Sequence, residues 1–238
     1  MKFLYETHLH TKETSRCGQT PAADIALQHK NLGFAGIFVT DHFATGYSHA
    51  NTIVTWKKRV DILQSGYLAA KKKGDEIGLD VFFAWEYPYH SGDFLTYGLG
   101  ADFLYAHKEL LDFEPNRDFA GYSKLIHDNG GYIIQAHPFR LASYMPNGIA
   151  KLQEGLIDAI EVNNGSHKDS SFNAQALKAA ERLSLSMSAG SDTHGITMSG
   201  TAYMAFEHRL KDSRDFIRQM KEKKYELVEG HLRKEDFL

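Results

Sequence analysis

Cysteine is almost absent from this sequence, because Cys17 is the only one among 238 residues. A disulfide within the chain is therefore excluded, and this scarcity indicates a protein of the reducing cytoplasm. No apolar run reaches the roughly 18 residues that a membrane-spanning helix needs. Residues 1–10 contain an acid and two histidines where a signal peptide has a long apolar core, so we expect neither a secreted protein nor a membrane partner.

A strong excess of either charge is missing as well. The formal net charge is −3, and without a basic surplus we expect no long nucleic acid as a partner. Repeats, low-complexity segments and long linkers are also lacking. We therefore expect one domain over residues 1–238, a length sufficient for a substantial core. Histidine is the unusual feature that remains, with 13 copies.

Short apolar runs alternate with segments of helical character along the chain. Strands are expected at 3–8, 35–42, 79–86, 94–100, 130–138, 157–164 and 185–194, with a further candidate at 201–207. Helices are expected at 21–32, 55–77, 117–129, 148–155, 172–183 and 212–223. Such alternation is typical of parallel βαβ units. Seven or eight strands in a chain of this length predict an α/β fold with a TIM-like barrel more than an open sheet.

Polar and charged residues gather at the carboxyl ends of these predicted strands. They are His8, His10, Asp41, His42, Glu86, His137, Asp192 and His194. In a closed barrel these ends surround one mouth, where such enzymes place their chemistry. We therefore expect residues from both halves of the chain to share one site.

The residue types at these ends favour a metal site. Side chains alternate along a strand, so His8 and His10 point to the same side and can hold one ion together, although a solvated or hydrogen-bonded pair is the alternative. Glu86 and Asp192 follow apolar strands, where an ionised carboxylate is costly unless it is paired or bound to a metal. The neighbouring sequence offers no lysine or arginine, and a divalent cation would supply the charge.

Five short motifs carry a resemblance to a known family. They are HLH at 8–10, TDH at 40–42, WE at 85–86, QAHP at 135–138 and GSDTH at 190–194. In this order and at this spacing they resemble the PHP (polymerase and histidinol phosphatase) family of metal-dependent phosphoesterases, relatives of the amidohydrolases. The resemblance covers about residues 3–200. It implies a single-domain, distorted (β/α)7 barrel.

The resemblance also implies which residues bind metal. One ion would be held by His8, His10, Glu86 and Asp192. Glu86 would bridge to a second ion that His137 also binds, and a third site would include His42 and His194. The expected cofactors are two or three divalent ions of zinc, manganese or iron.

Two positions of the family pattern leave alternatives open in this chain. Family members often carry a further histidine on the second metal after the fourth strand. Here Asp102 stands near that place and His107 follows slightly later. The third site commonly takes an acidic residue or a histidine shortly after the first motif, and Glu13 and Cys17 are the candidates there.

Arg140 follows the QAHP motif and bears on the substrate. A guanidinium offers a forked pair of donors that suits an anionic phosphate, although a surface arginine is the alternative. With Asp192 or His194 handling protons, the predicted enzyme hydrolyses a small phosphate ester, either a phosphorylated metabolite or a nucleotide, through a metal-activated hydroxide. The alternatives are an amidohydrolase-like hydrolase of C–N or C–O bonds and a non-catalytic metal-binding module.

Overall fold

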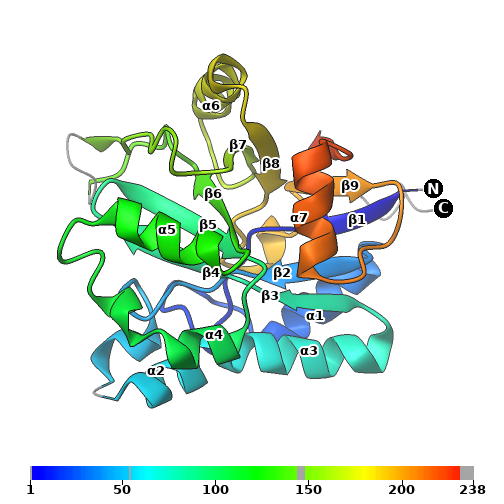
Figure 1. Cartoon of the computed structure of the whole chain (residues 1–238). Helices are drawn as coiled ribbons and strands as arrows, with labels where there is room; N and C mark the ends of the chain where they lie inside the picture. Colours follow the sequence, from blue (N-terminus) through cyan, green and yellow to red (C-terminus); the bar gives the residue numbers. More distant parts are fainter. Residues whose placement is uncertain (1, 54, 144–147, 231–238) are drawn as a thin grey trace.

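The computed structural model describes residues 2–53, 55–143 and 148–230 (Figure 1). The strands are β1 (Phe3–Glu6), β2 (Gly36–Val39), β3 (Asp80–Phe83), β4 (Trp85–Tyr89), β5 (Gly92–Tyr97), β6 (Tyr132–Ala136), β7 (Ala159–Asn164), β8 (Ser186–Gly190), β9 (Ala202–Phe206) and β10 (Glu226–Glu229). The α-helices are α1 (Ala22–Asn31), α2 (Trp56–Leu63), α3 (Ser65–Ile77), α4 (Ala101–Ala106), α5 (Phe119–Asp128), α6 (Ser171–Leu183) and α7 (Ser213–Glu222). Short 3₁₀ helices are η1 (His49–Thr52), η2 (Lys108–Leu111) and η4 (Ile196–Met198).

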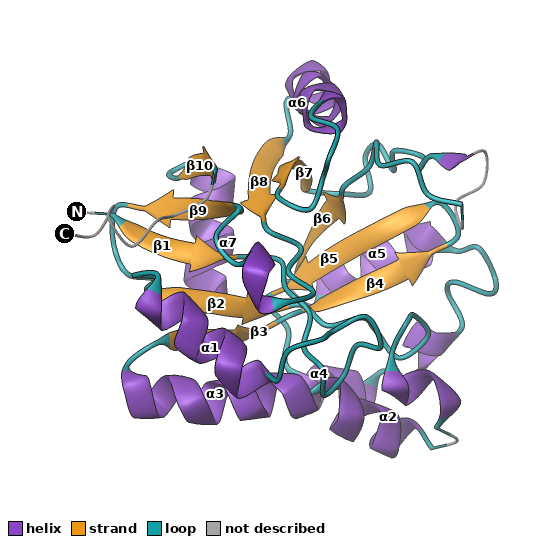
Figure 2. Cartoon of the chain, turned by 180° about the vertical axis from the view of Figure 1, so that it is seen from behind, coloured by secondary structure: helices purple, strands orange, loops and turns teal. Residues whose placement is uncertain are grey.

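The strands form two five-stranded sheets, which Figure 2 shows from behind. The first sheet has the order β10-β9-β1-β2-β3, with β1, β2 and β3 parallel and β9 antiparallel to both of its neighbours. The second sheet has the order β4-β5-β6-β7-β8. In it β6, β7 and β8 are parallel, whereas β5 is antiparallel to both β4 and β6. Helices α1 and α3 run together beside β2 and β3 (Figure 1).

The predicted TIM-like (β/α)7 barrel is therefore wrong, since the described residues form two mixed sheets and no closed barrel. A turn at 90–91 joins β4 directly to β5, which leaves no room for a crossover helix and imposes antiparallel pairing. The single strand predicted at 79–86 is divided at Ala84 into β3 and β4, which belong to different sheets.

Two predicted helices also differ from the structure. The segment 55–77 contains two helices, α2 and α3, which meet at Gln64. The helix predicted at 148–155 does not form in the described chain. Gly148 and Gly155 have φ angles of 75° and 77°, and this left-handed backbone conformation is incompatible with an α-helix.

The core between the sheets is held together by α7. Phe216 of this helix packs against strands of both sheets, with ring centroids 4.6 Å from Phe38 and 5.0 Å from Tyr97. The helix forms because apolar residues recur on one face while Asp212 caps its start by accepting a hydrogen bond of 2.8 Å from the Asp215 N–H. None of the helices in the described ranges is long and apolar enough to cross a bilayer.

Two isolated bridges join the sheets where the polar strand ends meet. Leu9, beyond β1, pairs with Thr193, beyond β8. His42, beyond β2, pairs with Glu86 of β4. Each bridge connects the first sheet to the second, so the polar residues flank a seam between the two sheets. The candidate site lies at this seam.

Candidate metal centre

Seven predicted site residues converge from five segments of the chain. They are His8 and His10 after β1, His42 after β2, Glu86 in β4, His137 after β6, and Asp192 and His194 after β8. Their donor atoms form three overlapping groups, in each of which all the atoms lie within 4.8 Å of one another. The groups are His8–His10–Asp192, His8–Glu86–His137 and His10–His42–His194.

The first group places two imidazoles and one carboxylate oxygen around a common point. The Nε2 atoms of His8 and His10 face each other at 3.2 Å. Asp192 Oδ1 lies 3.5 Å from His8 Nε2 and 3.3 Å from His10 Nε2. All three side chains are buried, so these donors point into the protein and not into bulk water.

Glu86 connects the groups, because its two oxygens face different histidines. Its Oε1 lies 3.2 Å from His137 Nε2 and 3.6 Å from His8 Nε2. Its Oε2 lies 2.7 Å from His42 Nδ1 and 3.4 Å from His10 Nε2. A carboxylate in this position can bridge two ions.

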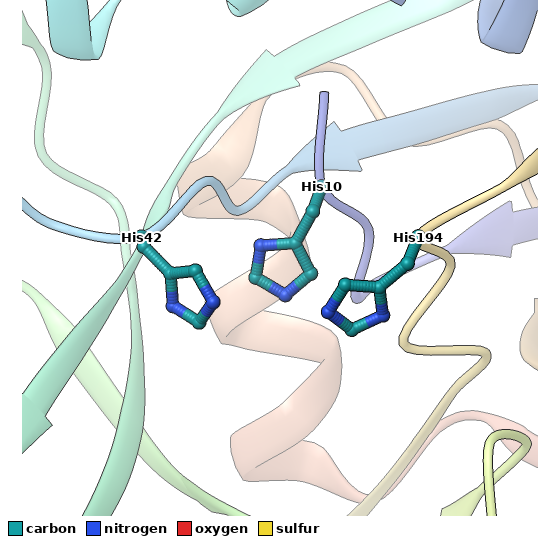
Figure 3. A group of neighbouring side chains, drawn as sticks. All are labelled: His10, His42 and His194. Carbon is teal, nitrogen blue, oxygen red and sulfur yellow. The ribbon is translucent and has the colours of Figure 1, made fainter. Parts of the chain in front are cut away.

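The third group consists of three imidazoles side by side, with His10 between His42 and His194 (Figure 3). The ring centroid of His10 lies 4.3 Å from that of His42 and 4.7 Å from that of His194. His194 Nδ1 lies 2.8 Å from the Asp192 carbonyl oxygen, which can only accept. The proton of this ring is therefore on Nδ1, and Nε2 is left as the atom with a lone pair.

Glu161 orients the first two groups and was missed in the sequence. His8 Nδ1 donates to Glu161 Oε1 at 2.8 Å, which leaves His8 Nε2 free for a cation. The His137 N–H donates to Glu161 Oε2 at 3.0 Å, and Asn164 Nδ2 donates to the same oxygen at 2.9 Å. The signal available in the sequence was an acid inside the apolar strand predicted at 157–164.

The backbone is strained where two of the candidate ligands enter the site. His137 and Asp192 have φ angles of 29° and 52°, in the left-handed region that residues other than glycine rarely adopt. The structure holds both residues there, and each turns its side chain into the centre. Strain of this kind is concentrated at functional sites.

The electrostatics of the buried groups favour cation binding. Burial alone would raise the pKa of Glu86, but the charge of His42 outweighs it and holds that pKa well below its ordinary value. Asp192 is also buried, and the charge of His8 holds its pKa well below the usual range. For His10, burial and the charge of His42 lower the pKa to about 3, so that this imidazole is neutral and able to act as a ligand.

Arg140 lies on the loop beyond β6, at the edge of the donor groups. Its Nη1 donates to Asp192 Oδ2 at 2.8 Å and its Nη2 donates to His137 Nε2 at 3.1 Å. The guanidinium lines a cavity of about 480 Å³ together with members of the donor groups. Further lining residues that the sequence did not indicate are Tyr47, Pro88 and Asp93.

The open alternatives are placed differently by the structure. Glu13 accepts hydrogen bonds of 3.0 and 3.1 Å from the Ala22 N–H, so it caps the start of α1. His107 pairs with Glu109 at 2.7 Å, and Asp102 is exposed in α4. Both are absent from the three groups that the described residues form. Cys17 is half-buried and is likewise absent from these groups.

The donor set fits a divalent metal centre. Imidazole and carboxylate donors suit zinc, manganese and iron. Glu86 Oε2 is a buried oxygen that accepts no hydrogen bond from the described residues, although His42 Nδ1 lies 2.7 Å away. An orphaned carboxylate oxygen among inward-facing imidazoles is what a bound cation would satisfy.

The chain is similar in fold to several solved structures, and one family profile matches part of it. Residues 170–225 match the profile of the PHP-associated family. No curated protein sequence matches the chain. The structure resembles a two-domain protein from Bacteroides vulgatus that contains a predicted PHP-like metal-dependent phosphoesterase, with a TM-score of 0.68 and 14% identity. That likeness covers 97% of this chain but only 65% of the two-domain protein, so the chain spans less than two thirds of it.

Two further solved structures share the fold. PsfC from Pseudomonas syringae has a TM-score of 0.60 at 15% identity, covering 95% of this chain and 91% of its own. A candidate metal-dependent phosphoesterase from Bifidobacterium adolescentis has a TM-score of 0.57 at 15% identity, covering 91% of this chain and 94% of its own. At these identities the likeness concerns the fold. With the profile match, it confirms the resemblance predicted from the five motifs.

Proposed function

Because the chain resembles the PHP family in its motifs, its profile match and its fold, we propose that it is a metal-dependent phosphoesterase acting on a small phosphate ester. The observation that carries the proposal is the position of Arg140, whose two terminal nitrogens reach Asp192 and His137 beside the donor groups. A forked cation next to metal donors matches the charge and shape of a phosphate. The substrate is a phosphorylated metabolite or a nucleotide small enough for the cavity.

The three donor groups would hold two or three ions of zinc, manganese or iron. Their proposed ligands are His8, His10, His42, Glu86, His137, Asp192 and His194. When bound, the ions would lower the pKa of water and offset the charge of the phosphate. The protein contributes imidazoles, among them the neutral His10, together with ionised carboxylates and a buried setting in which these charges act strongly.

Arg140 is proposed to bind the phosphate. In the structure its Nη2 donates to His137 Nε2, the nitrogen through which this histidine would bind metal. A cation bound at that nitrogen would occupy its lone pair, and the guanidinium would then be able to donate to a phosphate oxygen. Its Nη1 stays close to Asp192, which keeps the guanidinium at the centre.

Asp192 and His194 are proposed to handle the protons. Hydrolysis joins a water oxygen to phosphorus and breaks the P–O ester bond, and the leaving oxygen takes up a proton. Asp192 Oδ1 faces His8 and His10, whereas its Oδ2 is turned toward Arg140. If a third ion binds His194, proton transfer is left to Asp192.

The test is a substrate screen on protein stripped of metal and reloaded with Mn²⁺, Zn²⁺ or Fe²⁺. Phosphomonoesters and nucleotides form one panel, and carboxylic esters, lactones and amides form the other. Metal-dependent phosphate release supports the proposal. Turnover confined to the second panel supports an amidohydrolase-like enzyme, and metal binding without any turnover supports a non-catalytic module.

A further inference from the structure

Ser15 lies in the loop that connects the first motif to α1, and its side chain is buried. Its hydroxyl oxygen has three neighbours within hydrogen-bond distance. Asp41 Oδ1 lies at 2.6 Å, the backbone nitrogen of His42 at 3.0 Å and His10 Nδ1 at 3.3 Å. A serine hydroxyl donates one proton and accepts through two lone pairs, so three partners use its full capacity and the direction of each bond can be deduced.

The proton of this hydroxyl is donated to Asp41. Oδ1 of that carboxylate already accepts a hydrogen bond of 2.7 Å from the Thr11 N–H, so it acts as an acceptor toward Ser15 as well. The backbone N–H of His42 can only donate, and it takes one lone pair of Ser15 Oγ. The remaining lone pair faces His10 Nδ1, which is a favourable contact only if that nitrogen carries a proton.

Asp41 is held in place from a second side. Its Oδ2 accepts a hydrogen bond of 2.6 Å from the Thr11 hydroxyl, and the carboxylate is buried. Gly66, in the first turn of α3, packs so closely against this pair that a Cβ there would collide with Thr11 Oγ1 and lie 2.6 Å from Asp41 Oδ2. The carboxylate is therefore fixed, and the Ser15 proton remains directed at it.

The tautomer of His10 decides whether two of the three donor groups can bind a cation, since this histidine belongs to both. With the proton on Nδ1, the lone pair lies on Nε2, which is 3.2 Å from His8 Nε2. The alternative is a proton on Nε2, with Asp192 Oδ1 at 3.3 Å or Glu86 Oε2 at 3.4 Å as its acceptor. That arrangement would leave no lone pair of His10 facing the centre.

We propose that Ser15 is a positioning residue that fixes His10 as the Nδ1–H tautomer and so presents its Nε2 to the metal centre. The inference rests on the proposed metal centre but not on the reaction performed there. The two histidines of the first motif then have different partners. His8 Nδ1 donates to the carboxylate of Glu161. His10 Nδ1 instead donates to a neutral hydroxyl whose direction Asp41 sets, and such partners determine which nitrogen of an imidazole is available to a metal.

Nuclear magnetic resonance on the metal-free full chain tests the inference, because the ¹⁵N chemical shifts of an imidazole distinguish its two neutral tautomers. The protein is labelled with ¹⁵N-histidine, and the His10 signals are assigned by their loss in His10→Gln. We expect the wild type to carry the proton on Nδ1. Ser15→Ala removes the acceptor, so the proton is expected to move at least in part to Nε2. A merely structural role of Ser15 would lower the stability of this variant and leave the tautomer unchanged.

The Zn²⁺ affinity of the same proteins, measured by competition with a chelator, is the second readout. Ser15→Ala should bind Zn²⁺ about 10–100-fold more weakly, as is typical when the partner of a ligating histidine is lost. Ser48→Ala is the matched control. Ser48 is equally buried and pairs with Ser15 in an isolated bridge, but its hydroxyl bonds to the Thr14 carbonyl and the Ala50 N–H instead of to an imidazole. This variant should keep the tautomer and the affinity of the wild type.

A proton on Nε2 in the wild type, an unchanged tautomer in Ser15→Ala, or equal Zn²⁺ affinities of these two proteins would each overturn the inference. If Ser15→Ala does not fold, the tautomer of the wild type decides by itself. Metal-dependent phosphate release without the expected tautomer would leave the proposed function standing and remove only the role of Ser15. The expected tautomer in a protein that hydrolyses no phosphate ester would keep the inference and reject the proposed function, whereas a wild type that binds no Zn²⁺ would overturn both.

Discussion

The two oxygens of the Asp192 carboxylate face different parts of the centre, and Arg140 donates a hydrogen bond to one of them. Arg140 Nη1 lies 2.8 Å from Asp192 Oδ2, while Oδ1 of the same carboxylate faces the imidazoles of His8 and His10. Ser166 also donates to Oδ2, at 3.1 Å. One side chain thus connects the first donor group to the proposed phosphate-binding arginine.

Replacement of Arg140 distinguishes phosphate from amide chemistry. Arg140→Lys keeps the charge but loses the fork, so turnover of a phosphomonoester should already decline. Arg140→Met should lower kcat/KM further, by about 2–4 kcal/mol in activation free energy. The measurement is kcat/KM of the three proteins on one phosphomonoester at matched metal content.

Arg182→Met is the control for that series, since Arg182 pairs with Glu154 at an exposed position away from the centre. It should leave kcat/KM unchanged. Equal values for wild type and both Arg140 variants would remove Arg140 from the site and strengthen the amidohydrolase-like alternative.

Asp192→Asn should abolish turnover and leave the fold largely intact. The substitution is nearly isosteric, but it removes a negative charge from the first donor group. Rates on the substrate found in the screen are measured together with circular dichroism. The exposed Asp112→Asn serves as the control. An unaltered kcat in Asp192→Asn would show that this carboxylate is neither a ligand nor a base.

The purified protein should contain at least about two transition-metal ions per chain, as the three overlapping donor groups indicate. Elemental analysis after purification without chelator measures this content. Protein dialysed against chelator and then reloaded with Mn²⁺ or Zn²⁺ provides the comparison. A content below about one ion per chain, without gain on reloading, argues against a multinuclear centre.

Glu161→Gln should weaken metal binding without removing a ligand. The change withdraws the negative charge that fixes the tautomer of His8, and loss of such a partner typically lowers metal affinity by about 10–100-fold. Metal affinity is measured by competition with a chelator. Glu181→Gln, on the exposed face of α6, is the matched control and should bind as the wild type does. Equal affinities would show that Glu161 has no orienting role.

Asp215 should make the stability of α7 depend on pH. Burial would raise the pKa of this carboxyl, but the Lys211 N–H and Arg218 lower it below the ordinary value. An acid whose pKa is lower in the folded state stabilises the fold above its unfolded pKa of about 4, and this contribution is lost as pH falls through the folded pKa. Asp215→Asn should therefore cost about 1–2 kcal/mol of unfolding free energy at neutral pH and less in acid. The measurement is urea unfolding of the metal-free wild type and Asp215→Asn, at neutral pH and in acid. If the variant loses as much unfolding free energy in acid as at neutral pH, the electrostatic account is contradicted.

The sequence indicated the converging residues better than the strand connections. Acids and histidines at the ends of apolar runs predicted which side chains meet, because those ends are brought together in either architecture. Their roles as ligands stay predictions. Glu161 was missed because it lies within a strand, where the residue pattern does not show which face borders a site.

The sheet arrangement was predicted wrongly for identifiable physical reasons. Pro88 within 85–89 does not suggest a strand, yet β4 is at the edge of its sheet, where proline is tolerated. Ala84 separates β3 of the first sheet from β4 of the second, but alanine is not a residue that marks a break in a strand, so the sequence reads as one extended run. Asp93 was missed for a related reason, since the predicted strand began one residue after it.

The position of the centre at the seam has a mechanical consequence. His8, His10 and His42 extend from the first sheet, whereas Glu86, His137, Asp192 and His194 extend from the second. Ions bound among them would act as cross-links between the two halves of the protein, a task that no disulfide can perform in a chain with one cysteine. A chelator would then lower the stability of the fold as well as remove a cofactor. The same ligands that determine the chemistry would contribute to the free energy that keeps the two sheets associated.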